Sequence, residues 1–204
     1  MPQNYAMKRA FLYAACVATL LFTSCGDYVK VQKTTDYDYR YEADKQYYAE
    51  GEYNRAALFL QEMVTGLKGT DKGEESLFLL GMSSYKSRNY DAATAYFRKY
   101  YETYPEGVYT EKAHFYCGMS PFNNVPEIKL DQTATLEASS EFQQFLELYP
   151  NSVFSDMAQA NIFKLQDRLV EKEYLSAKLY YDLGSYFGNC TNGGSNYQAC
   201  IVTA

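Results

Sequence analysis

Two stretches of this 204-residue chain nearly repeat each other, forty-five residues apart. The first reads YFRKYYETYPEGVYTEKA (residues 96–113) and the second reads EFQQFLELYPNSVFSDMA (residues 141–158). In each, an apolar pattern at helical spacing runs into a Tyr-Pro step and resumes a few residues later. A proline cannot continue the hydrogen-bond ladder of a helix. Each stretch therefore predicts the end of one helix and the start of the next.

Similar helix-ending residues and turns divide most of the chain into pairs of helices. Gly51 ends the first predicted helix, as glycines often do, and the restart at Tyr90 opens the fourth. A polar, glycine-flanked turn is predicted at 68–73, and a break before residue 173. The predicted helices are, in order, 41–50, 52–64, 74–85, 90 to the proline at 105, 113–120, 132–149, 155–172 and 173–187.

The second pair matches the register of the tetratricopeptide repeat, a 34-residue helix–turn–helix unit. Small residues stand where the helices touch, and Phe97 fills the gap toward the next repeat. The sequence therefore predicts an all-α, tetratricopeptide-like helix-turn-helix solenoid of about three and a half pairs over residues 39–187. With Gly81 at the eighth position, the fourth, seventh, twentieth, twenty-fourth and thirty-second positions are Leu77, Leu80, Ala93, Phe97 and Pro105.

The third pair carries an insertion. Gly118 again takes the eighth position, whereas Ala138, Phe142 and Pro150 fall into register only after eleven extra residues are allowed. Eleven residues added to a 34-residue unit account for the distance between the repeated stretches. We place the insertion at about 121–130, where we expect Pro121 to interrupt the first helix.

The N-terminal 24 residues have the pattern of a lipoprotein signal peptide. Lys8 and Arg9 precede an uncharged stretch, 10–22, which is shorter than the roughly 20 apolar residues of a spanning helix. Small residues then lead into Cys25, which we expect to become the acylated first residue of the mature protein. An ordinary secretory signal with a chance cysteine is the alternative. Residues 25–38 lack helical periodicity and are predicted to form a lipid-attached tether.

Composition and motifs exclude several functions. A net charge of −6 argues against nucleic-acid binding, which depends on lysine and arginine. The chain has one histidine and no catalytic or metal-ligand spacing, so we expect no enzyme activity, no metal and no cofactor. Cys117 is predicted to be a buried small residue, and the pairing of Cys190 with Cys200 stays open.

What remains is a protein-binding surface. Stacked helix pairs present a concave face that binds extended peptides or partner domains, and the first helix of each pair lines it. Residues 98–101 lie on a second helix and are predicted to form a solvated face. The candidate groove-lining residues on first helices are Tyr47, Tyr48, Tyr85, His114 and Tyr116.

Taken together, these features resemble the BamD (YfiO-type) family of outer-membrane assembly lipoproteins, in a form typical of Bacteroidetes. The resemblance covers residues 7–187. The segments that carry it are the signal peptide ending at the cysteine, DKQYY (44–48), NYDAA (89–93), YFRKYYETYP (96–105), FLELYPNS (145–152) and SAKLYYDLGSY (176–186).

The resemblance implies a non-enzymatic scaffold, anchored by its N-terminal lipid in the outer membrane and facing the periplasm. The implied partners are the barrel-assembly core subunit, other assembly lipoproteins and unfolded outer-membrane proteins, with no nucleic acid. The alternative is another periplasmic tetratricopeptide lipoprotein that scaffolds envelope or division proteins. Residues 188–204 have no charge and no helical period, and we expect an aberrant or truncated end there; a natural disordered tail is the alternative.

Overall fold

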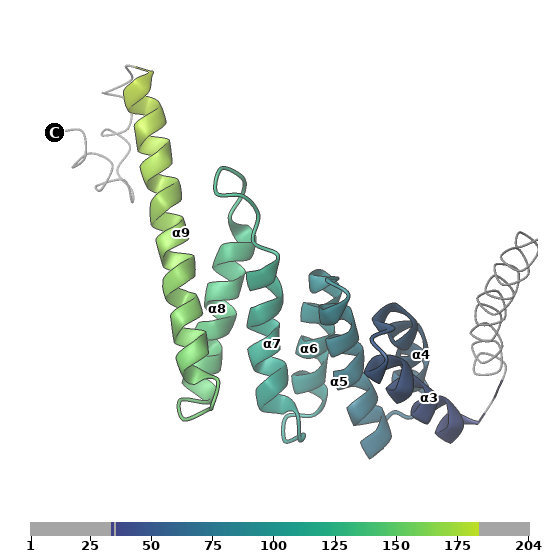
Figure 1. Ribbon diagram of the computed structural model, residues 1–204. Helices are drawn as coiled ribbons and strands as arrows, with labels where there is room; N and C mark the ends of the chain where they lie inside the picture. The colour runs from purple at the N-terminus through teal and green to yellow at the C-terminus, as the bar shows by residue number, and fades with distance from the viewer. Residues whose placement is uncertain (1–33, 35, 184–204) are drawn as a thin grey trace, which may run out of the picture. The chain divides into compact units, whose positions relative to one another are not determined.

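The computed structural model describes residue 34 and residues 36–183, and every regular element in that part of the chain is an α-helix (Figure 1). The predicted all-α, tetratricopeptide-like architecture is confirmed. The chain divides into a unit that ends at Ser76 and a unit that begins at Leu77, with the division inside α5. The helices are α3 Tyr37–Ala49, α4 Tyr53–Gly66, α5 Asp71–Lys86, α6 Tyr90–Thr103, α7 Thr110–Asn123, α8 Thr133–Leu148 and α9 Ser155–Asp182.

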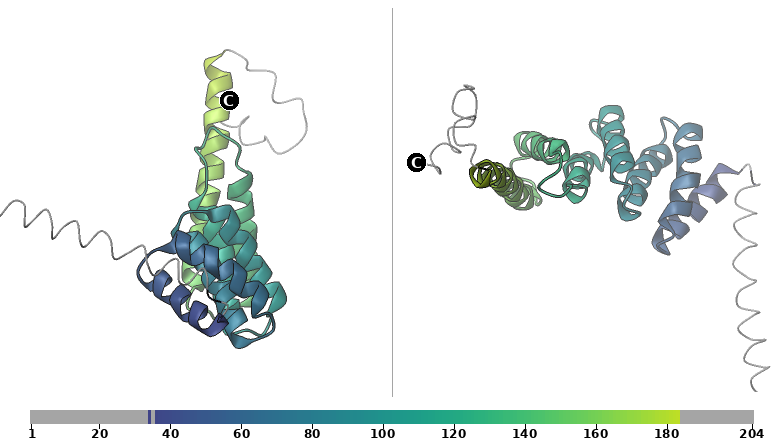
Figure 2. Two further views of the ribbon diagram at one scale, coloured as in Figure 1. Left: turned by 90° about the vertical axis from the view of Figure 1, so that its right-hand side faces the viewer. Right: turned by 90° about the horizontal axis from the view of Figure 1, so that it is seen from above.

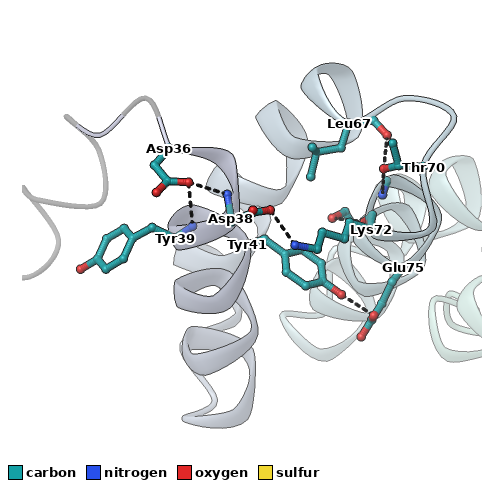
Figure 3. A network of polar contacts seen from close by, with 10 residues as sticks. Asp36, Asp38, Tyr39, Tyr41, Leu67, Thr70, Lys72 and Glu75 are labelled. Carbon is teal, nitrogen blue, oxygen red and sulfur yellow. Dashed lines mark hydrogen bonds and ion pairs between the residues drawn. The ribbon is translucent and has the colours of Figure 1, made fainter.

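In the first unit, α3 packs against α4. Helix α3 begins at Tyr37, two residues before the predicted start of the repeat domain at residue 39. The cause is Asp36, whose carboxylate accepts hydrogen bonds from the backbone N–H groups of Asp38 and Tyr39 (Figure 3). Such a cap satisfies N–H groups that the first helical turn leaves unpaired.

Helix α5 begins earlier than expected, so the predicted turn at 68–73 is too long. Thr70 caps the helix, because its Oγ1 accepts a hydrogen bond from the backbone N–H of Gly73 at 3.1 Å. Gly73 is therefore a helical residue and not part of a turn. A Cβ atom at Gly73 would lie 2.1 Å from the carbonyl oxygen of Leu67, which explains the glycine by close backbone approach.

In the second unit the helices pack in chain order, α6 with α7, α7 with α8 and α8 with α9 (Figure 2). Two glycines lie where the helices of a pair touch, as predicted, and each lies against a phenylalanine ring of the second helix of its own pair. A Cβ atom at Gly81 would lie 2.7 Å from Cε1 of Phe97, and one at Gly118 would lie 2.8 Å from Cδ1 of Phe142. Both rings are fully buried. The glycines are thus required by the rings that cover them.

The repeated Tyr-Pro stretches form two equivalent joints. Each Tyr-Pro step ends a helix, as predicted, and α6 and α8 end at the residue before the tyrosine. The first residue of the following helix then bonds back to that tyrosine. Thr110 Oγ1 donates to the carbonyl oxygen of Tyr104 at 2.7 Å, and Ser155 Oγ donates to that of Tyr149 at 2.9 Å.

Aromatic stacking closes both joints in the same way. Tyr109 stacks on Phe78 with 4.4 Å between ring centroids, and Phe154 stacks on Phe115 with 4.6 Å. The spacing that the two stretches share therefore reflects one packing arrangement that occurs twice.

Pro121 does not interrupt α7, contrary to the prediction. The helix continues to Asn123, and Pro121 is buried inside it. A proline in a helix lacks the N–H group that would donate to the preceding turn, and Pro121 takes this place only three residues before the C-cap at Asn124. The irregular part of the insertion is consequently shorter than expected and occupies residues 124–132.

The predicted break near residue 173 is also wrong, because α9 is one helix of 28 residues. It contains no glycine or proline that would end it. Its C-terminal part runs past the N-terminal end of α8 (Figures 1 and 2). Large side chains there are accordingly exposed, among them Val170, Tyr174, Leu179, Tyr180, Tyr181 and Leu183.

Candidate protein-binding surfaces

Two candidate groove residues occupy equivalent places in successive pairs. Tyr48 meets Tyr53 edge to face with 5.5 Å between ring centroids, and Tyr85 meets Tyr90 in the same way at 5.6 Å. Each contact joins the end of a first helix to the start of the second. Both Tyr48 and Tyr85 are half-buried. Only part of each ring is therefore available to a ligand.

Tyr85 and Tyr116 lie together in the second unit. Their ring centroids are 5.1 Å apart, and the ring of Tyr116 also stacks on Phe97 at 5.6 Å. The hydroxyl oxygen of Tyr85 accepts a hydrogen bond from Nδ2 of Asn123 at 2.7 Å. Burial raises the pKa of Tyr85. The pair thus fastens α5 to α7 and leaves only a partial surface.

Tyr47 and His114 are also half-buried and stacked. Tyr47 lies on Phe59, with 5.9 Å between centroids. His114 lies nearly parallel to Tyr101 at 3.7 Å, and 5.6 Å from Tyr149. Burial lowers the pKa of His114, although the nearby Glu141 opposes this. The imidazole is therefore neutral at pH 7. The groove-lining role of these residues stays a prediction.

The predicted solvated face at 98–101 is wrong in part, because Tyr100 is fully buried. Arg98 is half-buried and forms ion pairs with Glu141 and, at 3.5 Å, with Glu137. The hydrogen bond to Glu141 raises the pKa of Arg98. This residue therefore ties α6 to α8. These ion pairs join two helices, and local sequence spacing does not reveal them.

Cys117 is buried and free, as predicted. Its Sγ lies 3.8 Å from the carbonyl oxygen of Thr94, and burial raises the pKa of the thiol. A thiol with a raised pKa is a poor nucleophile. Cys117 is accordingly a packing residue. Cys25, Cys190 and Cys200 lie outside the described residues.

A polar network joins α3 to the start of α5 in the first unit (Figure 3). Two ammonium groups lie near the ring of Tyr41, with Lys45 Nζ 5.1 Å and Lys72 Nζ 5.3 Å from its centroid. Its hydroxyl donates a hydrogen bond to Glu75. Lys72 also pairs with Asp38 at 2.6 Å. Burial, and then the bond to Glu75, raises the pKa of Tyr41 to about 12.

A second polar feature of α3 was not predicted. Asp44 is 0% exposed, and neither carboxylate oxygen has a hydrogen-bond partner among the described residues. Arg40 lies on the same helix and pairs with Glu62 of α4. Burial raises the pKa of Asp44 to about 7, against the opposing effect of Arg40. Such a carboxyl group is costly to ionise in place.

Two further searches covered the described part of the chain. No group of three or more His, Cys, Asp or Glu side chains is placed to hold a metal ion there. No helix in the same residues is long and apolar enough to cross a membrane.

Comparison with known proteins gives concordant matches. A sequence model of the YfiO family, described as outer membrane lipoprotein, matches residues 34–191. A protein of Caulobacter vibrioides named outer membrane protein assembly factor BamD is 23% identical over 134 residues, which cover 66% of this chain and 44% of that protein. The protein of the same name from Pasteurella multocida is 21% identical over 182 residues, covering 84% of this chain and 69% of that protein. The chain thus spans less than half of the Caulobacter protein.

Proposed function

The chain belongs to the YfiO family of outer membrane lipoproteins, and we propose that it is a non-enzymatic scaffold of the machinery that assembles β-barrel proteins in the outer membrane. It would hold the barrel-assembly core subunit, other assembly lipoproteins and unfolded barrel substrates through the surfaces of its helix pairs. The observation that carries the proposal is the extent of the family match. It runs through all the described helices, including both Tyr-Pro joints.

The architecture supports binding rather than chemistry. The described helix pairs bury aromatic rings and leave several tyrosines only half-buried. A tyrosine offers a large apolar ring and a polar hydroxyl, which suits contact with a protein partner. The proposed action is therefore to position partners next to one another at the membrane.

Membrane attachment in this proposal rests on acylation of Cys25. Stable anchoring by lipid requires more than a single acyl chain. An N-terminal cysteine that carries two acyl chains meets this requirement. Cys25→Ser should shift the protein from the membrane to the soluble fraction and abolish its labelling by radioactive palmitate. Retention of both properties in this variant would contradict the anchor at this residue.

The main test is co-purification from gently solubilised outer membranes. The full-length protein should bring down the barrel-assembly core subunit in near-stoichiometric amount. Recovery of envelope or division proteins, with no assembly subunit, would overturn the proposal in favour of the alternative scaffold.

A matched pair of variants tests the predicted groove. Tyr48→Ala removes a half-buried ring from a first helix, and Leu58→Ala removes a side chain that is 59% exposed on a second helix. We expect Tyr48→Ala to lower recovery of the partner and Leu58→Ala to leave it unchanged. Equal recovery with both variants would exclude Tyr48 from the binding surface.

A further inference from the structure

An apolar stripe runs along an exposed side of α9. Its members recur at spacings of seven, four and seven residues, which keeps them within about 20° of one line on a helix of about 3.6 residues per turn. Their side chains are between 51% and 68% exposed. The members of the stripe are Phe163, Val170, Tyr174 and Tyr181. These large side chains therefore share one face of the helix.

The stripe is not the face by which α9 packs on α8. Helix α9 lies at one end of the second unit, next to α8 (Figure 1). The side chains that it contributes to the core shared with α8 lie about 100–160° around the helix from the stripe. They are Ala158, Ile162 and Leu165.

The stripe also faces away from the inserted segment 124–132. Arg168 Nε donates a hydrogen bond to Oε1 of the buried Gln132 at 3.2 Å, and Lys172 Nζ donates to the carbonyl oxygen of Leu130 at 3.0 Å. Both cationic side chains start about 140–180° around α9 from the stripe. The contacts of α9 with α8 and with the insertion therefore leave the stripe exposed.

The apolar positions of the stripe are symmetric about its middle. Phe163 and Tyr181 are each nine residues from position 172, and Val170 and Tyr174 are each two residues from it. If two copies of α9 lie antiparallel, Phe163 of each copy faces Tyr181 of the other, and Val170 faces Tyr174. Such a twofold contact is self-complementary, because the same patch serves on both copies. The symmetry thus identifies a second copy of this chain as the occupant.

The charged residues that border the stripe permit this arrangement. Asp167, Glu171 and Lys178 border it on one side and Glu173 on the other, and all four are exposed. Asp167 lies within one residue of the level of Lys178 of the second copy, and this opposite-charge pair occurs twice. Glu171 and Glu173 each lie near their own equivalents at the rim, where water and salt screen the repulsion. Apolar burial therefore drives the association.

The area of the stripe suits a reversible dimer. A large aromatic side chain has about 150–250 Å² to bury, so the four exposed side chains present on the order of 400 Å² per copy. This is close to the largest apolar patch of a typical monomer. Two copies would bury about 800 Å² from their stripes, and flanking side chains add to this toward the roughly 1,000 Å² of a specific interface.

We propose that α9 docks antiparallel on α9 of a second copy of this chain, with the stripe of each copy covering that of the other. The rings of Phe163 and Tyr181 pack at the two ends of the contact, and Val170 packs with Tyr174 at its centre. The inference goes beyond the proposed function, because self-association through α9 is measurable without any assembly subunit.

Photocrosslinking of the full chain in detergent tests the pairing and its direction. The photoreactive residue p-benzoylphenylalanine replaces Phe163. Positions 163 and 181 are 18 residues apart, about 27 Å along one helix, so a crosslink between them joins two copies. We expect a covalent dimer in which position 163 is bonded to the tryptic peptide that begins at Leu179. Crosslinks confined to single chains, or a dimer joined between the two positions 163, would overturn the proposal.

Sedimentation velocity of matched variants measures the contribution of the stripe. Val170→Glu places like charges on facing surfaces and should raise the dissociation constant of the dimer at least about tenfold. The control is Leu179→Glu, because Leu179 is 57% exposed on the same helix but lies about 160° from the stripe. It should change the constant less than about twofold. A monomeric wild type, or equal effects of the two variants, would refute the interface. Far-ultraviolet circular dichroism confirms that both variants keep their helices.

Discussion

The first and second helix pairs follow one register, as their turns show. Gly51 N–H donates to the carbonyl oxygen of Tyr48 at 3.2 Å, and Arg88 N–H donates to that of Tyr85 at 3.0 Å. The edge-to-face tyrosine contacts that flank these turns also correspond. Residues 37 positions apart are therefore structural equivalents.

The two pairs differ where their helices touch. On this register Asp44 is equivalent to Gly81, and Leu60 to Phe97. The second pair buries a phenyl ring on a glycine, and the third pair does the same. At the equivalent positions the first pair instead buries a carboxyl group and a smaller side chain. One backbone arrangement thus accommodates either a ring or a titratable group, and only the second choice makes stability depend on pH.

Transferring the acid to the second pair should have the largest effect. Gly81→Asp forces a carboxyl group against the ring of Phe97, where the second pair has leucine, not arginine, at the position equivalent to Arg40. We expect a loss of about 4 kcal/mol or more in the free energy of unfolding, measured in urea. Ala95→Asp, at an exposed position of α6, is the control and should cost less than about 1 kcal/mol. Similar losses for both variants would show that the site tolerates the charge.

Removing the acid from the first pair should abolish a pH dependence. The ordinary carboxyl pKa is 3.8, and burial raises that of Asp44 to about 7. The unfolded chain therefore loses this proton first as the pH rises, and stability falls between these two values. We expect the wild type to lose about 3 kcal/mol relative to Asp44→Asn between about pH 5 and about pH 8. Parallel pH profiles for the two proteins would contradict the assignment.

A double-mutant cycle tests the steric rule of the second pair. Gly81→Ala alone should cost about 2 kcal/mol, because the added Cβ would lie 2.7 Å from the ring of Phe97. Phe97→Leu reproduces the smaller residue of the first pair and makes room for that atom. The combined cost should therefore fall short of the sum by about 1 kcal/mol or more. If the costs of the two substitutions simply add, the ring of Phe97 does not require a glycine at position 81.

The smallest expected effect concerns the turns. Gly51 and Arg88 both have positive φ, at 83° and 65°. This conformation strains a side chain but not glycine. Arg88→Gly should therefore stabilise the protein by about 1 kcal/mol, and Gly51→Ala should destabilise it by a similar amount. Thermal unfolding of the two variants should shift in opposite directions, and a shift in the same direction would break the equivalence.

The sequence predicted the features that depend on short-range sterics. Gly81, Phe97 and Pro105 stand at fixed spacing because ring packing and the ends of helices tolerate few substitutes. The joints at both Tyr-Pro steps followed from the same rule. The candidate tyrosines were placed correctly on first helices, but most of their neighbouring rings come from other helices and could not be read from spacing.

The features that were missed depend on contacts distant in the chain. Pro121, for example, is buried inside α7. The continuity of α9 is the exception, because the absence of glycine and proline at its predicted break is a local feature of the sequence. Gln132 is defined by partners on the insertion and on α9. One signal in the sequence could have identified Asp44. Tyr53 and Tyr90 are 37 residues apart, and the same spacing aligns Asp44 of the first pair with Gly81 of the second.

The central claim is that the first pair buries a carboxyl group where the other pairs bury a ring on a glycine. The most direct test is a carbon-13 nuclear magnetic resonance titration of the Asp44 carboxyl group in the folded protein. The structure predicts a pKa of about 7. A value near the ordinary 3.8 would show that Asp44 is ionised in contact with water or a cation, and would contradict the account.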